Sequence, residues 1–203
     1  TQGVSSAASD VYKRQEEPLP PQVLWADDYN RPNGAVTTTP VGDKTYLYIG
    51  NALGEVEGNE LKLTSVSGSG PLMVVDSGIP NGKFKITVRS LGNVLPGIVF
   101  RVVDANNRFL IARGAVDATK WRLTKRTAST TTVDVFVSSA PIAIGDVFEI
   151  TLNGPSIQIT LNGQLWWSGE DNDHVNGTKF GVYSGTSVSP AKYDDMSFTT
   201  LGG

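Results

Sequence analysis

The spacing of the apolar residues is the feature that most constrains this fold, because it is two residues almost everywhere. Apolar and polar residues alternate over residues 84–89, 148–152 and 157–161, which is typical of strands with one buried face. No window shows the 3.6-residue period of an amphipathic helix. Turn-forming sequences such as Asn-Gly at 153–154 and 162–163 separate the segments. The sequence therefore predicts an all-β fold, either a two-sheet sandwich or a barrel.

Composition and charge restrict the class of protein further. The chain has 203 residues, no cysteine and a formal net charge of −3. Without cysteine, neither disulfides nor thiolate metal sites can form, so a hydrophobic core must provide the stability. The net negative charge disfavours nucleic acid as a partner, because phosphate binding needs a clustered basic face. No apolar run approaches the roughly 20 residues that span a bilayer, so no membrane insertion is expected.

The N-terminal segment is expected to lie outside the fold. Residues 5–15 resemble the in-frame translation of a sequencing-library adapter, so residues 1–15 are interpreted as a disordered artefact. The chain does not begin with Met, and we expect it to be the downstream piece of a longer reading frame. Residues 16–23 are rich in proline and predict an extended linker. One domain is then expected over residues 24–203, which is long enough to bury about 70% of its unfolded surface.

Two acidic pairs bracket this domain. Asp-Asp-Tyr-Asn-Arg opens it at 27–31, and Tyr-Asp-Asp-Met-Ser-Phe closes it at 193–198. Between them lie Gly-Ile-Val-Phe-Arg at 97–101, Trp-Arg-Leu-Thr-Lys-Arg at 121–126 and Phe-Gly-Val-Tyr at 180–183. Together these segments resemble the concanavalin-like (laminin-G-like) jelly rolls of bacterial secreted proteins and phage tail proteins. The resemblance implies a two-sheet antiparallel jelly-roll β-sandwich whose first and last strands are neighbours.

The expected pairing of the first and last strands raises the question of a metal site. If the end strands pair, Asp27 or Asp28 would approach Asp194 or Asp195, and clustered carboxylates are what a Ca²⁺ ion needs. In the alternative, one Asp of each pair accepts hydrogen bonds from backbone amides while the other is solvated. The sequence does not fix the six to eight oxygen ligands of a Ca²⁺ site, so Ca²⁺ is the only cofactor considered.

Catalytic signatures are weak. The sole histidine, His174, lies in a polar segment without a serine-nucleophile motif, so we interpret it as a surface loop residue. Residues 55–60, Glu-Val-Glu-Gly-Asn-Glu, superficially match the E-x-D-x-x-E spacing of glucanases. The Gly-Asn pair in the middle instead predicts a hairpin turn, whereas that motif requires a continuous strand. No enzymatic activity is therefore expected.

A sugar-binding surface needs an aromatic ring for the C–H side of the sugar and planar polar groups for its hydroxyls. Because Arg101 lies between Phe100 and Val102, a period of two directs it away from the core onto an open sheet. The adjacent Trp166 and Trp167 should face opposite ways, so at least one is partly exposed or packs against a second copy in a homo-oligomer. The predicted ligand-binding residues are Arg101, Arg113, Trp121, Trp166, Trp167 and Tyr183. For each of them the alternative is core packing or a surface ion pair.

These inferences favour a non-catalytic recognition module that binds carbohydrate or a cell-surface polymer. It would be one domain of a larger protein, extracellular or in a phage tail. Two alternatives stay open: a purely structural module of a tail or appendage, and a glycan hydrolase or lyase.

Overall fold

The computed structural model describes residues 18–92, 96–113, 119–128, 131–184 and 190–202, without side chains at 65–70, 96, 131–133 and 140. The predictions for residues 1–15 and for the first two residues of the linker fall outside these ranges. Within the described residues every regular element is a β-strand, so the all-β prediction is confirmed. The described part contains no helix that is long and apolar enough to cross a membrane.

The fourteen strands of the described residues follow the turn signals of the sequence. They are β1 (Val23–Asp27), β2 (Gly34–Ala35), β3 (Tyr46–Val56), β4 (Leu61–Asp76), β5 (Gly82–Ser90), β6 (Pro96–Asp104), β7 (Asn107–Arg113), β8 (Lys120–Thr127), β9 (Thr131–Pro141), β10 (Val147–Asn153), β11 (Ser156–Leu161), β12 (Gln164–Glu170), β13 (Lys179–Ser184) and β14 (Lys192–Thr199).

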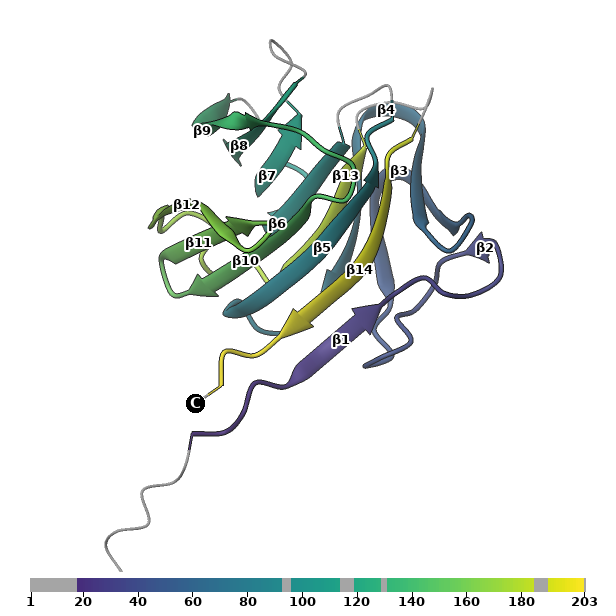
Figure 1. The fold of residues 1–203 in the computed structure, drawn as a ribbon, viewed down its shortest axis with the longest axis horizontal. Coiled ribbons are helices and arrows are strands. Elements are labelled where there is room, and N and C mark those ends of the chain that lie inside the picture. Colours follow the sequence, from purple (N-terminus) through teal and green to yellow (C-terminus); the bar gives the residue numbers. More distant parts are fainter. Residues whose placement is uncertain (1–17, 93–95, 114–118, 129–130, 185–189, 203) are drawn as a thin grey trace, which may run out of the picture.

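The strands form two layers, and all of their pairings are antiparallel (Figure 1). The first sheet has the order β12-β11-β10-β5-β14-β1, and the second has the order β2-β3-β4-β13-β6-β7-β8-β9. The long strand β4 joins them, because its start at Leu61 pairs with β14 and its end at Leu72–Asp76 pairs with β13. The predicted two-sheet jelly-roll sandwich is confirmed.

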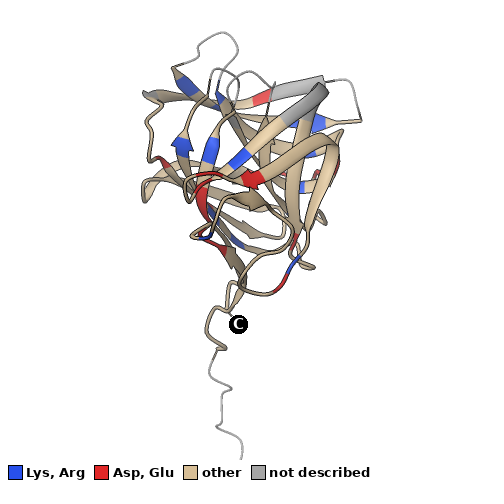
Figure 2. Cartoon of the chain, turned by 90° about the vertical axis from the view of Figure 1, so that its right-hand side faces the viewer, with Lys and Arg blue, Asp and Glu red and all other residues tan. Residues whose placement is uncertain are grey.

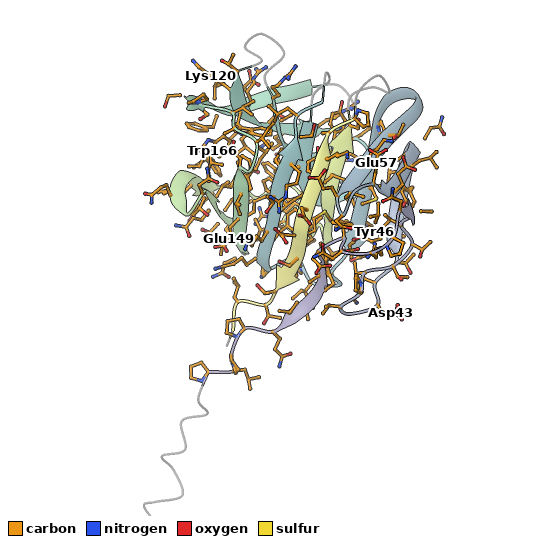
Figure 3. The ribbon with its side chains drawn as sticks, turned by 45° about the vertical axis from the view of Figure 1, so that its right-hand side comes forward. Asp43, Tyr46, Glu57, Lys120, Glu149 and Trp166 are labelled. Carbon is orange, nitrogen blue, oxygen red and sulfur yellow. The ribbon has the colours of Figure 1, made fainter. Side chains whose placement is uncertain are left out.

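The alternating residues of both sheets build one main core between the layers. Phe84, Ile86 and Val88 of β5 are fully buried in it, and Phe148 and Ile150 of the neighbouring β10 join them. Side chains fill the space between the two layers (Figure 3). The strands predicted from the period of two therefore bury the residues that the sequence assigned to the core.

A second, smaller apolar cluster lies on the opposite side of the second sheet, which we call its outer face. It consists of the fully buried Leu72, Val74, Val99 and Val102, with Ile49, Leu110 and Tyr183 partly buried against it. These residues alternate along their strands with residues of the main core, such as Met73 and Ile98. The second sheet is therefore apolar on both faces over its central strands.

The two ends of the domain are adjacent, as the resemblance implied. β1 pairs with β14, with Ala26 opposite Ser197 and Asp27 opposite Met196. The C-terminus lies beside the start of β1 (Figure 1). Strand pairing thus brings both acidic pairs to one seam of the first sheet.

Candidate functional site

The acidic pair near the start of the domain forms a buried network. The fully buried carboxylate of Asp27 accepts hydrogen bonds from the backbone amide of Tyr29 at 2.8 Å, from both terminal nitrogens of Arg31 at 2.8 Å, and from the hydroxyl of Tyr46 at 2.9 Å. The two tyrosine hydroxyls are 3.0 Å apart. Burial raises the pKa of both tyrosines well above its usual value. This network holds the entry strand to the sandwich and leaves Asp27 no free lone pair for a ligand.

The pair near the end follows the same plan. Asp194 accepts two hydrogen bonds from Arg89, at 3.0 and 2.8 Å, and burial raises its pKa. Asp28 and Asp195 are exposed. The described residues include no group of three or more His, Cys, Asp or Glu side chains that could hold a metal ion. The structure therefore does not assemble the Ca²⁺ ligands suggested by the sequence. It shows one buried and one exposed Asp in each pair.

Arg101 is a correction to the sequence analysis. It is fully buried, with a φ of +48°, rather than open on a sheet face. The register between β13 and β6 shifts from Gly181↔Val99 to Lys179↔Val102, so three steps along β6 match two along β13. This bulge inserts one extra residue. It turns Val102 to the outer face instead of the core side that Phe100 occupies, so the period of two fails at this point.

The Arg101 guanidinium ties the bulge to two turns. It donates to the carbonyl oxygen of Asp171 at 3.0 Å and to that of Gly154 in the β10–β11 turn. Gly177 packs against the Arg101 backbone so closely that a Cβ there would lie 2.5 Å from the Arg101 carbonyl carbon. Arg101 is therefore a structural link between the layers and is not available to a ligand.

Two further predicted ligand residues lie on the core side. Trp121 is fully buried, and its indole nitrogen donates to Asp146 at 2.9 Å. Arg113 is opposite Trp121 in the β7–β8 register, so both side chains point to the same side of the sheet. Arg113 is half-buried. The predicted grouping of these two residues with Tyr183 on an open face is wrong, because Tyr183 lies on the outer face.

Trp166 and Trp167 lie on β12, an edge strand of the first sheet. Both are partly exposed and both pack against the main core, because a register shift next to them interrupts the alternation. The Trp166 ring meets Phe136 and Phe148 edge-on, at centroid distances of 4.9 and 5.7 Å. In Figure 3 it lies on the opposite side of the sandwich from Tyr46. The prediction that at least one of the two tryptophans is partly exposed is confirmed.

Trp166 lines a cleft of about 460 Å³ between the edge strands β9 and β12. The cleft walls are Phe136, Ser138, Ser139, Pro141, Ala143, Asp146, Leu161, Asn162, Gln164, Leu165 and Trp166. Much of its polar lining is already engaged: Asp146 accepts from Trp121, from the Ala143 amide and from Asn162. The cleft offers an aromatic wall but few free hydrogen-bonding groups.

Tyr183 presents the aromatic surface on the outer face of the second sheet. The guanidinium carbon of Arg108 lies 5.7 Å from the centre of the half-exposed Tyr183 ring. Gly97, opposite Tyr183 on β6, makes room for the ring, since a Cβ there would lie 3.0 Å from a ring carbon and 2.6 Å from Leu110. An aromatic ring, a planar cation and an apolar floor therefore meet on this face.

Sequence reasoning missed Arg108, although the signal was present. Phe109 and Ile111 are core residues, so Arg108 and Leu110 must alternate to the outer face. Arg122 and Arg126 of β8 share that face, because Arg126 is opposite Arg108 in the register and Arg122 follows the same alternation.

The residues weighed for catalysis have structural roles. Gly58 and Asn59 have φ values of +67° and +62°, and Val56 pairs with Leu61 across them. The hairpin turn predicted there is confirmed. His174 is partly buried, contacts the Phe109 ring edge-on and donates from Nε2 to the Arg126 carbonyl oxygen at 2.8 Å. The histidine is thus tied to the core, more than a surface loop residue would be.

No protein-family model and no curated protein sequence matches the chain. Solved structures do. A carbohydrate-binding module, CBM66 from Bacillus subtilis, aligns with a TM-score of 0.54 and 16% identity over 75% of this chain and 92% of its own. A structure described with endo-acting O-glycanases of the human gut microbiota aligns with a TM-score of 0.63 and 10% identity over 89% of this chain and 99% of its own. The laminarinase from Rhodothermus marinus aligns with a TM-score of 0.57 and 13% identity over 90% of this chain and 98% of its own.

These similarities, together with the strand order, define the class of protein. The chain is an all-β, concanavalin-like jelly-roll β-sandwich, a fold found in glycan-binding modules and in glycan hydrolases. At these identities the comparisons establish the fold, and the function must be argued from the site.

Proposed function

We propose that this domain is a non-catalytic glycan-binding module whose ligand lies on the outer face of the second sheet. The observation that carries the proposal is the half-exposed Tyr183 ring with the Arg108 guanidinium 5.7 Å from its centre. An aromatic ring packs against the C–H side of a sugar, and the Arg108 guanidinium, which is 4% exposed, supports the ring through a cation–π contact. The similarity to a carbohydrate-binding module supports the proposal.

The ligand is a carbohydrate or a cell-surface polymer. The domain would act within a larger extracellular or virion protein, which is the setting implied by the resemblance noted in the sequence. A sheet face suits a polymer, because it offers an extended surface rather than an enclosed pocket.

A glycan hydrolase is the second candidate, because the structures with this fold include glucanases. Residues 55–60 argue against it. Their carboxylates flank a hairpin turn, and Lys62 bridges Glu55 and Glu57 at 2.9 and 3.1 Å. They are therefore not presented along one continuous strand, as the glucanase spacing requires.

The test is a glycan-array screen of the full chain, with and without Ca²⁺, followed by titration of the best glycan. Tyr183→Ala should weaken binding about tenfold, the loss expected for one stacking ring. Trp166→Ala is the matched control, since that ring lines the β9–β12 cleft instead. A loss of binding in Trp166→Ala alone would place the site in the cleft and refute the proposal. New reducing ends would identify a hydrolase, and an empty array would favour a structural module.

A further inference from the structure

The sandwich is linked along one side and open along the other. On the linked side, β4 belongs to both sheets, because its start pairs with β14 and its end pairs with β13. On the open side lie the edge strands β12 and β9, each with one neighbour among the described strands (Figure 1). Each edge therefore carries a row of backbone N–H and C=O groups without a strand partner in the described part of the chain. The β9–β12 cleft lies between these two edges.

The walls of the cleft suit an uncharged, apolar group. The Trp166 ring meets Phe136 edge-on at 4.9 Å, and Leu165, which is 61% exposed, also lines the cleft. The described residues that line it include no Lys or Arg. Its one carboxylate, Asp146, is 3% exposed and already accepts three hydrogen bonds. A charged ligand would find no counter-charge there, so the cleft matches a neutral partner.

The strand β12 lacks most of the features that protect an edge strand from pairing with another chain. Such strands are usually very short or carry lysine, proline or inward-pointing charges. β12 has seven residues, neither Lys nor Pro, and a single charged residue, Glu170, at its last position. Its pairing with β11 shifts once, beside Thr160, and is regular from Trp167 to Glu170. The edge is therefore open to a further strand.

The other side of the molecule is different, because charges cover it. Lys62 and Lys192 both form salt bridges with Glu57, at 3.1 Å each, and Lys192 also reaches Glu60 at 3.5 Å. Figure 2, which faces that side, shows acidic and basic positions interspersed on it. The uncharged edge at β12 is thus a local feature rather than a property of the whole surface.

The size of the β12 edge fits a peptide better than a second copy of the chain. Its seven residues span about 23 Å, and two packed sheets are about 10 Å apart, so a partner would bury on the order of 300 Å² on each side. A stable dimer buries roughly 800 Å² per partner. An added strand needs less, because its main-chain hydrogen bonds supply affinity and pockets for alternate side chains supply specificity.

We propose that the β12 edge binds an extended, uncharged peptide segment of a partner protein, which adds a strand to the first sheet and places an apolar side chain in the β9–β12 cleft. The side chains of an added strand alternate between the two faces of the sheet, so every second one points to the cleft side, towards Trp166 and Phe136. A glycan fits this cleft less well, because its hydroxyls need free polar groups. The peptide site is independent of the glycan site proposed at Tyr183.

The experiment selects random nonapeptides displayed on phage against the full chain, and measures the best synthetic peptide by calorimetry. The selected peptides should be uncharged overall, with apolar residues at alternate positions. Leu165→Glu should weaken binding about tenfold or more, because it places a charge beside an apolar cleft. Leu53→Glu is the matched control, since Leu53 is 60% exposed and lies on β3, far along the other sheet.

A second measurement tests whether the peptide binds as a strand. In an antiparallel pair, alternate residues direct their N–H groups to the neighbouring strand. N-methylation of one alternating set of peptide residues should therefore weaken binding about tenfold or more, while methylation of the other set should have little effect.

Several results would overturn the proposal. These are the absence of any enriched peptide, an equal loss of binding in Leu53→Glu, and N-methylation effects that do not alternate. A dimer that Leu165→Glu dissociates in sedimentation would assign the edge to a second copy, and loss of glycan binding in Leu165→Glu would assign the cleft to a glycan. If Leu165→Glu does not fold, Gln164→Glu places the same charge at the exposed neighbouring position of the cleft.

Discussion

Replacing Asp27 by Asn should destabilise the domain by about 3 kcal/mol. The carboxylate accepts four hydrogen bonds, two on each oxygen, from Tyr29, Arg31 and Tyr46. In Asn one oxygen becomes an NH₂ group that faces two donors, so two bonds are lost, at about 1.5–3 kcal/mol each for bonds to a charged group. The Arg31 side chain is 29% exposed and can recover water, which places the expected loss near the lower end.

Urea and thermal unfolding of the full chain measure this loss. For a domain of this size about 3 kcal/mol corresponds to a fall in Tm of about 6–12 °C. Asp28→Asn is the control, since that side chain is exposed and bonds only to Asn30 among the contacts of the described chain; it should change stability by less than about 0.5 kcal/mol. If Asp27→Asn were as mild as the control, the network would not hold the entry strand.

Three further predictions concern stability. Gly177→Ala should cost about 2 kcal/mol or more, because its Cβ would lie 2.5 Å from the carbonyl carbon of Arg101; an unchanged urea midpoint would contradict the tight bulge. Burial raises the pKa of Tyr29 and Tyr46, so as the pH rises the unfolded chain loses these protons before the folded chain does. The free energy of unfolding should therefore keep its full value below about pH 10 and fall above it, by about 1.4 kcal/mol per pH unit for each tyrosine. Urea unfolding from pH 9 to 11 checks this, and Tyr46→Phe should fall less steeply than the parent. Deleting residues 1–15 should leave Tm unchanged, and a fall of several degrees would refute their exclusion from the fold.

The fold could be predicted because its signals are local and repeated. Alternation at Phe84, Ile86 and Val88 reports one buried face regardless of what covers it, and Gly58-Asn59 requires a tight turn wherever it occurs. Each strand and turn thus carries its own evidence. The partnership of the end strands came from the family resemblance, since no local pattern specifies which strands pair.

The site was harder, because it depends on events that alternation does not record. The bulge at Arg101 changes the face that every later residue of β6 occupies. Residues 100–102, which form the bulge, include no glycine or proline that would mark it. Trp121 is core because Asp146, 25 residues away, accepts its N–H. Arg108 was within reach of the period of two, but its burial beside the Tyr183 ring is visible only in three dimensions.

The seam between β1 and β14 also decides how the domain responds to mechanical load. Val23 lies opposite Thr199, so the described chain enters and leaves the sandwich at the same corner (Figure 1). A pull between them acts along the interstrand hydrogen bonds, which lie perpendicular to the strands, and opens them one pair after another, as a zipper opens. Had the ends left from opposite corners, all the bonds would share the load in shear. Tension on the ends therefore peels β1 away first and separates Trp25 from Phe198, whose rings stack at 6.5 Å, before it reaches the remaining strands.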